Sequence, residues 1–491
     1  MSVSIRKFIH FYLNDQLVIL DHVAADHTLL DFLRLDRQMR GTKEGCAEGD
    51  CGACTVLVGR LLNGELYYES VNACIRFVGS LDGCHVVTVE AVKSPTGGLH
   101  IVQQAMVDTH ASQCGFCTPG FVMSLYGLWM QETAPSVARI EKALQGNLCR
   151  CTGYAAIIRA AESVVLSGDL NGDLLVKHRA DMIEKLSGLK DGCRVEVEAD
   201  GQQIIIPANV DDLAIVLEEN PNAVLVAGST DVGLWVTKFM RPITPAVFIG
   251  GLEELCQVSA DADHIRLGSG VTYSALYPLI VQHFPQLREF WNRIGGEQVR
   301  NMGTIGGNIA NGSPIGDTPP ALIALQASII LRKNTSRRKV LLENYFIEYG
   351  KQDREKSEFV EAIEIPKLSV NSHYAVYKIT KRMDEDISAV CGGFSVQLDA
   401  DGRVKNAIFA YGGMAGTPKR AAQAEAAVLG EMWDEAAIEV AIATLPQDFT
   451  PLSDWRASAD YRLLVAQNLL RRFYLETTGE AELRLRREAV A

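Results

Sequence analysis

Cysteines are the residues of this sequence whose spacing points most directly to chemistry. The chain has 12 cysteines in 491 residues, and nine of them lie between Cys46 and Cys151. Cysteines that served only as small apolar core residues would be scattered more evenly. The first 20 residues alternate around Asn14-Asp15 like a β-hairpin and unlike a secretory signal. Metal ligation is therefore a better first hypothesis for the cysteines than disulfide bonding.

The first regular set of cysteines has the spacing C-x4-C-x2-C, with a fourth cysteine further along the chain. This spacing is typical of plant-type 2Fe-2S sites. Glycines in the segment GCAEGDCGAC allow the backbone to turn its N–H groups toward the sulfur atoms of an anionic cluster. A structural zinc site is the alternative, but zinc favours C-x2-C pairs. The proposed ligands of this first cluster are Cys46, Cys51, Cys54 and Cys74.

The second set consists of a C-x2-C pair and a later C-x-C pair. Each pair precedes a segment with helical periodicity, and Pro119 is a start signal for the first of these helices. Helix N-termini offer free N–H groups and a partial positive charge, which favour thiolates and an anionic cluster. A redox-active C-x2-C disulfide would leave the C-x-C pair unexplained. The proposed ligands of a second 2Fe-2S cluster are Cys114, Cys117, Cys149 and Cys151.

Other reactive side chains do not form a catalytic pattern in this sequence. It contains ten histidines but no H-E-x-x-H motif, and no G-x-S-x-G nucleophile elbow. We therefore expect no catalytic residue for substrate chemistry on this chain. The cysteines outside the two sets are isolated, and we expect them to be small apolar core residues: Cys84, Cys193, Cys256 and Cys391.

The elements that must position the cysteines change character along the chain. Short strand patterns separated by glycine-rich loops occur in the first 90 residues, at 7–13, 55–58 and 86–89. Helical patterns follow at 121–130, 137–148 and 155–166. The polar stretch 168–192 contains several glycines and is the best candidate for a linker.

A second globular region begins near Arg194. A buried-strand pattern at 224–227 runs into Gly228, and the stretch 301–312 is rich in glycine and asparagine, which favour turns. Strand patterns return around Tyr374. The stretch from about 419 to 487 has helical periodicity.

The composition limits the class of protein. A hydrophobic content of 47% over 491 residues predicts three or four domains. The net charge of −13 argues against nucleic acid as a partner and against a polybasic membrane anchor. No stretch of 18 apolar residues is present, so we expect no membrane span and a cytoplasmic protein.

The cysteine motifs resemble those of the molybdenum hydroxylase (xanthine oxidase) family. GCAEGDCGACTV, QCGFCTPG and NLCRCTGY follow one another in the family's order. The resemblance implies an α+β multidomain fold with a ferredoxin-like β-grasp domain, a four-helix bundle, a vanillyl-alcohol-oxidase-like FAD domain and a C-terminal α+β domain. The boundaries that follow are 1–90, 91–167, a linker at 168–192, 193–370 and 371–491.

The same resemblance implies two flavin loops, in LVAGSTDV and in NMGTIGGNIANGSPIGD. These loops alone are weak evidence, because turn-rich connections look similar and no G-x-G-x-x-G follows a strand. Gln113 matches a position that contacts the pterin cofactor. Ile294 replaces an aromatic residue found in some relatives. The implied FAD contacts are Leu225, Val226, Ala227, Gly228, Ser229, Thr230, Asp231, Val232, Ile294, Gly303, Thr304, Gly307, Asn308, Asp317, Val360 and Lys378.

In that family, substrate is hydroxylated at a molybdopterin centre, and the sequence contains no segment that resembles this part. The resemblance therefore implies a partner molybdopterin subunit, with electrons passing through two 2Fe-2S clusters to FAD and then to NAD+. A fused iron–sulfur and FAD chain favours, by analogy, hydroxylation of hypoxanthine and xanthine and a dimer of two-chain units. The segment from Asp384 to Asp386 lies near the NAD face in the family, but it also fits a solvated loop.

Three alternatives remain open from the sequence. The chain could serve a hydroxylase of aldehydes or N-heterocycles, because the substrate pocket would be on the partner. It could be an iron–sulfur flavoprotein that works without a hydroxylase partner. It could also be a scaffold in which zinc replaces both clusters.

Overall fold

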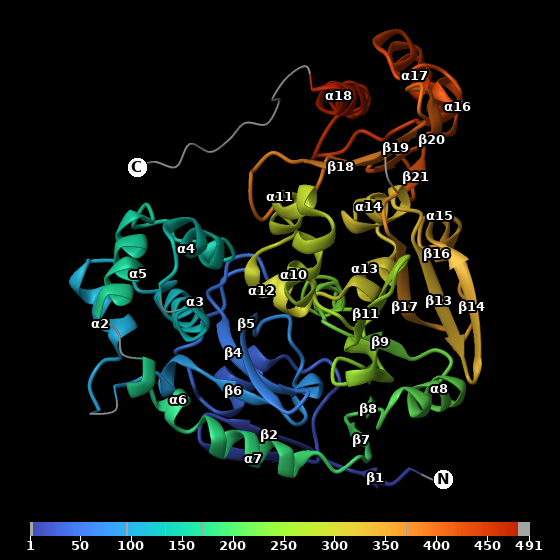
Figure 1. Ribbon diagram of the computed structural model, residues 1–491. Helices are drawn as coiled ribbons and strands as arrows, with labels where there is room; N and C mark the ends of the chain where they lie inside the picture. The colour runs from blue at the N-terminus through green and yellow to red at the C-terminus, as the bar shows by residue number, and fades with distance from the viewer. Residues whose placement is uncertain (1–2, 95–96, 133, 168–169, 370, 480–491) are drawn as a thin grey trace.

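The computed structural model describes residues 3–94, 97–132, 134–167, 170–369 and 371–479. Figure 1 shows a helical bundle beside a small N-terminal sheet, two further sheets next to these, and a C-terminal sheet with its helices at one end. The α+β multidomain class predicted from the sequence is confirmed. In the described part of the chain, no helix combines the length and apolar content needed to cross a membrane.

The N-terminal sheet carries the first cysteine set. Its strands have the order β3-β2-β6-β4-β5. The predicted hairpin is confirmed, since β2 and β3 pair antiparallel across a turn in which Asn14 has φ 53°. Phe11, Phe32 and Phe77 are fully buried beneath the sheet. The elements are β2 (Ile9–Leu13), β3 (Gln16–Leu20), the short α1 (Leu29–Asp31), β4 (Thr55–Leu62), β5 (Glu65–Asn72) and β6 (His85–Val87).

The helical bundle carries the second cysteine set. Both predicted helix starts are confirmed, because α3 follows Cys117 directly and α5 begins shortly after Cys151. The pattern at 137–148 predicts a longer helix than the structure has. That helix ends at Leu144, after which the chain runs toward the first cysteine loop and Leu148 N–H bonds the carbonyl of Cys51. The helices are α2 (Ile101–Asp108), α3 (Thr118–Gln131), α4 (Val137–Leu144) and α5 (Ala155–Ser167).

The stretch expected to be a linker is largely helical in the structure. Residues 168–169 lie outside the described residues, and α6 (Leu174–Lys177) and α7 (Arg179–Leu189) follow. Met182 and Leu186 are buried in the core shared with the bundle, and α7 packs on β2, β4 and β5. Met182 and Leu186 lie one helical turn apart and anchor this polar segment in that core.

The middle of the chain forms two sheets that lie beside each other. The first has the order β1-β7-β8-β10-β9, and β1 comes from the N-terminus, where it pairs parallel with β7. Two helices, α8 (Val210–Glu219) and α9 (Val232–Thr237), follow its strands. The strands are β1 (Ile5–Arg6), β7 (Arg194–Ala199), β8 (Gln202–Ile206), β9 (Val224–Val226) and β10 (Ala246–Phe248).

The second of these sheets has the order β11-β12-β17-β13-β14, and its pairs are antiparallel. Its strands are β11 (Val258–Ala260), β12 (His264–Gly268), β13 (Ser328–Lys333), β14 (Ser336–Leu341) and β17 (Phe359–Pro366). A strand pair, β15 (Phe346–Glu348) and β16 (Lys351–Gln352), lies outside it. The helices are α10 (Tyr273–His283), α11 (Arg288–Asn292), α12 (Glu297–Met302), α13 (Ile305–Asn311), α14 (Thr318–Ala324) and α15 (Leu342–Tyr345).

The glycine- and asparagine-rich stretch 301–312 is helical over most of its length, although its composition favours turns. The helices α12 and α13 are separated only by Gly303 and Thr304. Thr304 Oγ1 accepts a hydrogen bond of 3.0 Å from Gly307 N–H and so caps α13. Gly312, at φ 65°, ends the helix.

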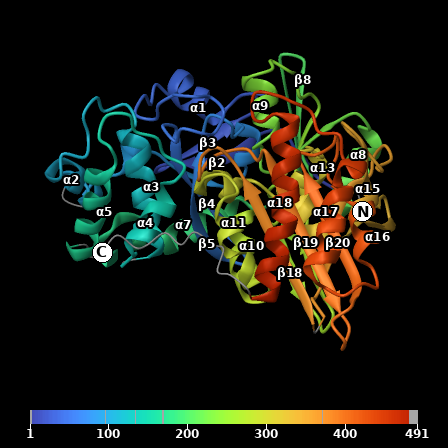
Figure 2. The same cartoon turned by 90° about the horizontal axis from the view of Figure 1, so that it is seen from above.

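The C-terminal sheet is covered on both faces. Figure 2 shows α17 and α18 lying across its strands. The helix α14 packs on the sheet from residues 193–370, which are called the FAD-like region below. Gly393 permits this close packing, because a Cβ there would lie 2.4 Å from the carbonyl oxygen of Pro320. The elements are β18 (Ser372–Ile379), β19 (Val390–Leu398), β20 (Val404–Gly412), β21 (Lys419–Arg420), α16 (Ala422–Val428), α17 (Glu435–Asp448) and α18 (Ala459–Thr478).

The start of α8 is held by a buried ion pair that allows a direct test. Asp212 has a fully buried side chain, bonds Arg194 Nη2 at 2.6 Å and accepts from Ala208 N–H at 2.9 Å. Asp212→Ala leaves the buried Arg194 charge with the half-exposed Glu219 and with Glu196 at the longer distance of 3.5 Å. The free energy of local opening should therefore fall by about 3–5 kcal/mol. Native-state hydrogen exchange of the β7 and β8 amides measures this loss.

Glu219→Ala is the matched control, because Glu219 pairs with the same arginine but is half exposed. Its loss should cost less than about 1 kcal/mol. Equal effects of the two substitutions would contradict the assignment.

Candidate cofactor sites

The first group of thiols lies in a loop between the N-terminal sheet and the bundle. The backbone N–H groups of Asp50 and Cys51 both point at Cys46 Sγ, at 3.4 Å. The loop achieves this by adopting positive φ at Ala47, Gly49 and Gly52. The inward-facing amides inferred from the glycine spacing are therefore present around this sulfur.

The four sulfurs of this group form a chain of contacts. Cys46 hydrogen-bonds with Cys51 and Cys74, and Cys74 also contacts Cys54. These contacts from Cys51 and Cys74 hold the pKa of Cys46 far below its usual value, and contact with Cys46 raises the pKa of Cys51. These contacts therefore favour the thiolate form at Cys46.

The second group of thiols lies at the surface of the bundle. Cys114 and Cys151 are exposed and contact each other, while Cys117 contacts the buried Cys149. The backbone N–H of Phe116, followed by the contact with Cys151, lowers the pKa of Cys114. Burial, followed by the contact with Cys149, raises the pKa of Cys117 to about 12. Thr152 Oγ1 donates to Cys149 Sγ at 3.1 Å.

The chemistry of both donor sets fits 2Fe-2S clusters, since each offers four cysteine sulfurs and hydrogen-bond donors aimed at sulfur. Within the described residues, no group of three or more His, Cys, Asp or Glu side chains is placed to hold a single metal ion. The fit of the thiols to clusters rests on their contacts with one another and with the backbone.

The two cysteine loops touch each other directly. Leu148, the residue before Cys149, donates its N–H to the carbonyl of Cys51 at 3.0 Å. Gly120 in the first turn of α3 faces Gly52, and a Cβ on Gly120 would lie 2.1 Å from the carbonyl oxygen of Gly52. A single backbone hydrogen bond thus connects a ligand of the first group to the neighbour of a ligand of the second.

A buried polar network ties this contact to the FAD-like region. Gln298 on α12 is 1% exposed, and its Nε2 lies 3.2 Å from Thr55 Oγ1, 3.2 Å from Ser124 Oγ and 2.9 Å from Asn147 Oδ1. Asn147 Nδ2 in turn donates to the carbonyl of Gly52 at 3.2 Å. One side chain therefore bonds the N-terminal sheet, the bundle and the residue two positions before Cys149.

The first implied flavin loop lies between β9 and α9. Gly228 faces α12, and a Cβ there would lie 1.7 Å from the carbonyl oxygen of Met302. Ser229 has φ 62° and is buried. The helix α9 then leads to the first thiol group, where Lys238 Nζ donates to the carbonyl of Cys46 at 2.5 Å. The implied loop residues are placed together here: Leu225, Val226, Ala227, Gly228, Ser229, Thr230, Asp231 and Val232.

The second implied loop is the α12–α13 junction that packs against Gly228. Gly303, Thr304, Gly307 and Asn308 lie in this junction or in the first turns of α13. Asn308 Oδ1 accepts from Thr318 Oγ1 at 2.5 Å, which connects the junction to α14. The backbone of α12 lies so close to Gly228 that no side chain has room there, and this position therefore requires glycine.

Asp317 and Lys378 are brought together as a buried ion pair, although they lie in different domains. Ser388 Oγ also donates to Asp317, at 2.5 Å. Two other implied contacts lie in the core: Val360 on β17 is 6% exposed, and Ile294 is 8% exposed next to α11. Gln113 lies at the second thiol group, where its Nε2 donates to the carbonyl of Cys151 at 3.1 Å.

The acidic segment 384–386 is only partly solvated. Asp384 Oδ1 accepts from Gln145 Nε2 at 3.1 Å, and Glu385 is 8% exposed beside Asp50 and Gly296. Burial first, and then the charge of Asp50, raise the pKa of Glu385 from 4.5 to about 9. A proton on Glu385 relieves the repulsion between the two carboxylates. Its Oε2 is buried and has no hydrogen-bond partner in the described part of the chain.

No sequence pattern pointed to Gln298, Thr237 or Lys238, and Glu385 stood out only as part of the acidic segment 384–386. All four hold the thiol groups or their loops in place. Thr237 Oγ1 donates to the carbonyl of Ala47 at 2.7 Å. These residues act across domains at sequence separations of more than 150 positions from the first cysteine loop, as in the Thr237–Ala47 pair. No local pattern carries that information.

Comparisons with known proteins match separate parts of the chain. A 2Fe-2S binding domain matches residues 88–162, and an FAD binding domain in molybdopterin dehydrogenase matches residues 198–368. A CO dehydrogenase flavoprotein C-terminal domain matches residues 375–477.

Whole-length similarity is to much longer proteins. Xanthine dehydrogenase from Emericella nidulans is 31% identical over 97% of this chain, and the match covers 39% of that protein. Xanthine dehydrogenase/oxidase from Rattus norvegicus is 29% identical over 96% of this chain and 39% of its own length. This chain thus spans less than half the length of these curated relatives.

One solved structure is similar to part of this chain. The cyanide-inactivated form of Cu,Mo-CO dehydrogenase contains a chain that matches with a TM-score of 0.53 and 25% identity. The match covers 57% of this chain and 98% of that one.

Gln298 provides a test of the three-domain junction. Gln298→Ala removes the donor shared by Thr55, Ser124 and Asn147, and should lower the free energy of local opening by about 2 kcal/mol. Amide hydrogen exchange at Leu148, whose N–H bonds Cys51, should accelerate accordingly. The exposed Gln423 offers a control, since Gln423→Ala should leave Leu148 unchanged. An unaltered exchange rate at Leu148 in Gln298→Ala would show that the junction does not depend on this side chain.

Glu385 predicts a pH dependence. Its folded-state pKa is raised from 4.5 to about 9, so the folded protein holds an extra proton between these values and its stability falls as pH rises through this window. Glu385→Gln should remove the slope and exceed the wild type in stability by about 2–4 kcal/mol near pH 8. Thermal unfolding from pH 5 to pH 9 measures the difference. Asp384→Asn, one residue away, should keep the wild-type slope, and a wild-type slope in Glu385→Gln would refute the assignment.

Proposed function

Because the chain belongs to the molybdenum hydroxylase family and carries its iron–sulfur and FAD domains, we propose that it is the electron-transfer subunit of a xanthine dehydrogenase. In this proposal a partner molybdopterin subunit hydroxylates hypoxanthine and xanthine in the cytoplasm. The chain receives the electrons and delivers them to NAD+, and it assembles as a dimer of two-chain units.

The observation that carries the proposal is the serial placement of the three cofactor sites. The second thiol group opens to the surface through Cys114 and Cys151. The first group lies behind it, one backbone hydrogen bond away at Cys51 and Leu148. The first flavin loop follows through α9, whose C-terminal Lys238 bonds the Cys46 carbonyl. An entry point, a middle site and a flavin site in that order form a relay.

The residues that would hold each group follow from the geometry. The eight cysteines of the two groups would ligate two 2Fe-2S clusters. The loop 225–232, the α12–α13 junction and the Asp317–Lys378 pair would hold FAD, with Val360 and Ile294 as lesser contacts. When bound, the clusters carry single electrons and the flavin converts them into two-electron reduction of the acceptor. The protein contributes fixed spacing, donors aimed at sulfur and a thiolate already stabilised at Cys46.

The surface around the second thiol group supports a partner at that position. Phe116 is 47% exposed, Leu148 42% and Tyr154 41%, and all three lie within two or three residues of a cysteine of this group. Exposed apolar residues around a reactive centre are typical of a protein interface. Gln113 at the same surface would face the pterin of the partner.

A second candidate is the electron-transfer subunit of another hydroxylase of this family. The structural match to CO dehydrogenase, at 25% identity over 57% of this chain, favours it. The two candidates differ in the substrate that the pocket of the partner subunit would accept. A screen of xanthine, aldehydes and N-heterocycles with the native complex therefore separates them.

One experiment tests the proposal as a whole. The native protein is isolated with whatever copurifies, and iron, flavin and molybdenum are counted per chain. We expect four irons and one FAD per chain, a second polypeptide with molybdenum, and reduction of NAD+ by xanthine. A protein that elutes alone on gel filtration, with iron and flavin but no molybdenum, would instead identify a flavoprotein without a hydroxylase partner, and zinc in place of iron would identify a scaffold.

Two variants test the electron order. Cys114→Ala should lose about half the iron and at least about tenfold in substrate-driven NAD+ reduction, since one cluster's ligand set becomes incomplete. Dye reduction by NADH should survive, because it needs only the flavin. Gly228→Val should show the opposite pattern, with the iron retained and the FAD occupancy reduced. Loss of NADH-driven dye reduction in Cys114→Ala with full flavin content would contradict the proposed order.

A further inference from the structure

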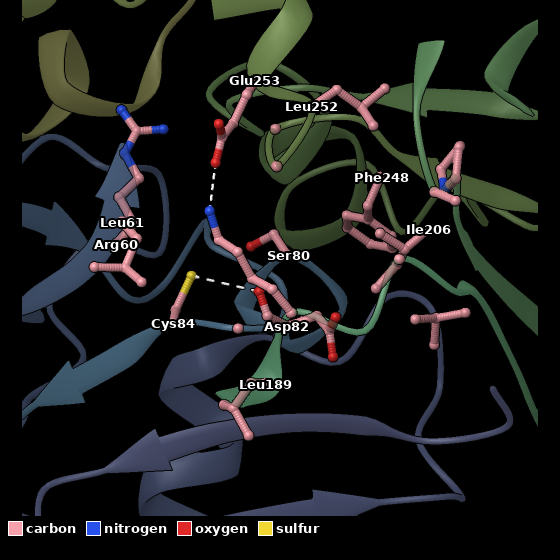
Figure 3. A pocket seen from close by; sticks show the side chains of 18 of the residues that line it. Arg60, Leu61, Ser80, Asp82, Cys84, Leu189, Ile206, Phe248, Leu252 and Glu253 are labelled. Atoms are coloured by element: carbon pink, nitrogen blue, oxygen red, sulfur yellow. Dashed lines mark hydrogen bonds and ion pairs between the residues drawn. The ribbon is translucent and has the colours of Figure 1, made fainter. Parts of the chain in front are cut away.

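A cavity of about 640 Å³ lies apart from the thiol groups and the flavin loops. Its walls come from three parts of the chain: the N-terminal part with Arg6 and residues between 60 and 84, residues 189–195 after α7, and residues between 206 and 257 that follow β8 and β10. Figure 3 shows Arg60 and Cys84 on one side and Phe248 and Ile206 on the other. The cavity therefore separates the first domain from the FAD-like region.

The walls combine apolar side chains with eight charged ones, four cationic and four acidic. Leu61, Leu189, Ile206, Phe248 and Leu252 provide the apolar surface. A cavity of this size with both kinds of lining has the composition of a site for a small organic ligand that carries a charge.

The three arginines of the lining are unequally paired. Arg6 bonds Asp82 with two nitrogens, at 2.9 Å and 2.7 Å, and its Nε lies 2.8 Å from Asp191. Arg60 has one ion pair, with Glu69 at 3.3 Å.

Arg76 stands apart from the other two. No carboxylate lies within ion-pair distance of it among the described residues. There its side chain makes one hydrogen bond, from Nη2 to the carbonyl of Ser80 at 3.3 Å. Its buried Nε has no hydrogen-bond partner in the described part of the chain. A guanidinium taken out of water without a counter-charge is costly, and it has the planar donor geometry that matches a carboxylate.

Acidic residues of the lining do not neutralise Arg76, because they are engaged elsewhere. Asp82 and Asp191 pair with Arg6. Glu253 pairs with Lys190, and a dashed line from Glu253 marks this pair in Figure 3. Glu254 accepts from Val210 N–H at 3.4 Å.

Three of the four cysteines that lie outside the thiol groups line this same cavity, although they are isolated in the sequence: Cys84, Cys193 and Cys256. Each is close to a backbone carbonyl, at 3.7–3.9 Å from its sulfur. Burial raises the pKa of Cys84 and of Cys256, so both remain neutral thiols. They add soft apolar surface and no charge that competes with Arg76.

We propose that this cavity binds an organic carboxylate with an apolar body, whose carboxylate pairs with Arg76 beside Arg60 and whose body packs on Phe248, Ile206 and Leu189. The site is distinct from the cofactor sites and does not depend on the proposed function. A ligand there contacts both the first domain and the FAD-like region, so its binding also strengthens their association.

Calorimetric titration of the native full-length protein tests the proposal with matched compounds. Naphthalene-2-carboxylate supplies the charge and the apolar body, naphthalene-2-carboxamide supplies the body alone, and inorganic phosphate supplies an anion alone. We expect one molecule of the carboxylate per chain and at least about tenfold weaker binding of the other two, which corresponds to the loss of one charge-assisted pair or of the apolar contact. Equal binding of the carboxylate and the carboxamide, or tighter binding of phosphate, would overturn it.

Variants locate the binding. Arg76→Gln should weaken the carboxylate at least about tenfold and leave the carboxamide unchanged, whereas Arg288→Gln, at an exposed arginine of α11, should change neither. Leu189→Trp fills the cavity without altering Arg76, and it should abolish binding even if Arg76→Gln does not fold. Wild-type affinity in Leu189→Trp, or in a folded Arg76→Gln, would place the binding elsewhere and end the proposal.

Discussion

The structure depends on the contact between two cysteine loops that are about a hundred residues apart in the chain. The backbone hydrogen bond from Leu148 to Cys51 and the close approach of Gly120 to Gly52 bring these loops together. Such a contact is possible only where neither glycine carries a side chain. The N-terminal sheet and the bundle must therefore pack at one distance and one orientation, and the remaining domains are arranged around this fixed pair.

The FAD-like region is joined to that pair by polar contacts, and those of Gln298 are buried. Gln298 enters between Thr55, Ser124 and Asn147, and α9 reaches the first loop through Thr237 and Lys238. Buried polar contacts contribute little net stability, but a misaligned interface leaves every one of them unsatisfied. Specific geometry between domains, which electron transfer over a fixed distance requires, is what this kind of interface provides.

The sequence revealed what is encoded locally. Cysteine spacing identified both thiol groups, the hairpin at Asn14 and the helix starts after Cys117 and Cys151 are confirmed, and the family resemblance is confirmed by the comparisons. The sequence did not predict the features that depend on contacts between residues far apart in the chain. The expected linker folds as α7 because Met182 and Leu186 find an existing core. The glycine-rich stretch becomes helical because α12 and α13 pack against Gly228 and Ser269. Isolated cysteines share a cavity that only the tertiary fold creates.

The acidic pair at Asp50 and Glu385 shows how charge is managed at the same junction. Two carboxylates in contact repel each other, and burial worsens the repulsion, so a single proton held by Glu385 is the lower-energy state. That proton removes one negative charge next to the loop that carries Cys46 and Cys51, where a thiolate is already stabilised. An ionised Glu385 would add repulsion to this anionic site and weaken the contact between the C-terminal and first domains. A neutral acid at this position therefore serves both the docking of the domains and the electrostatics of the first thiol group.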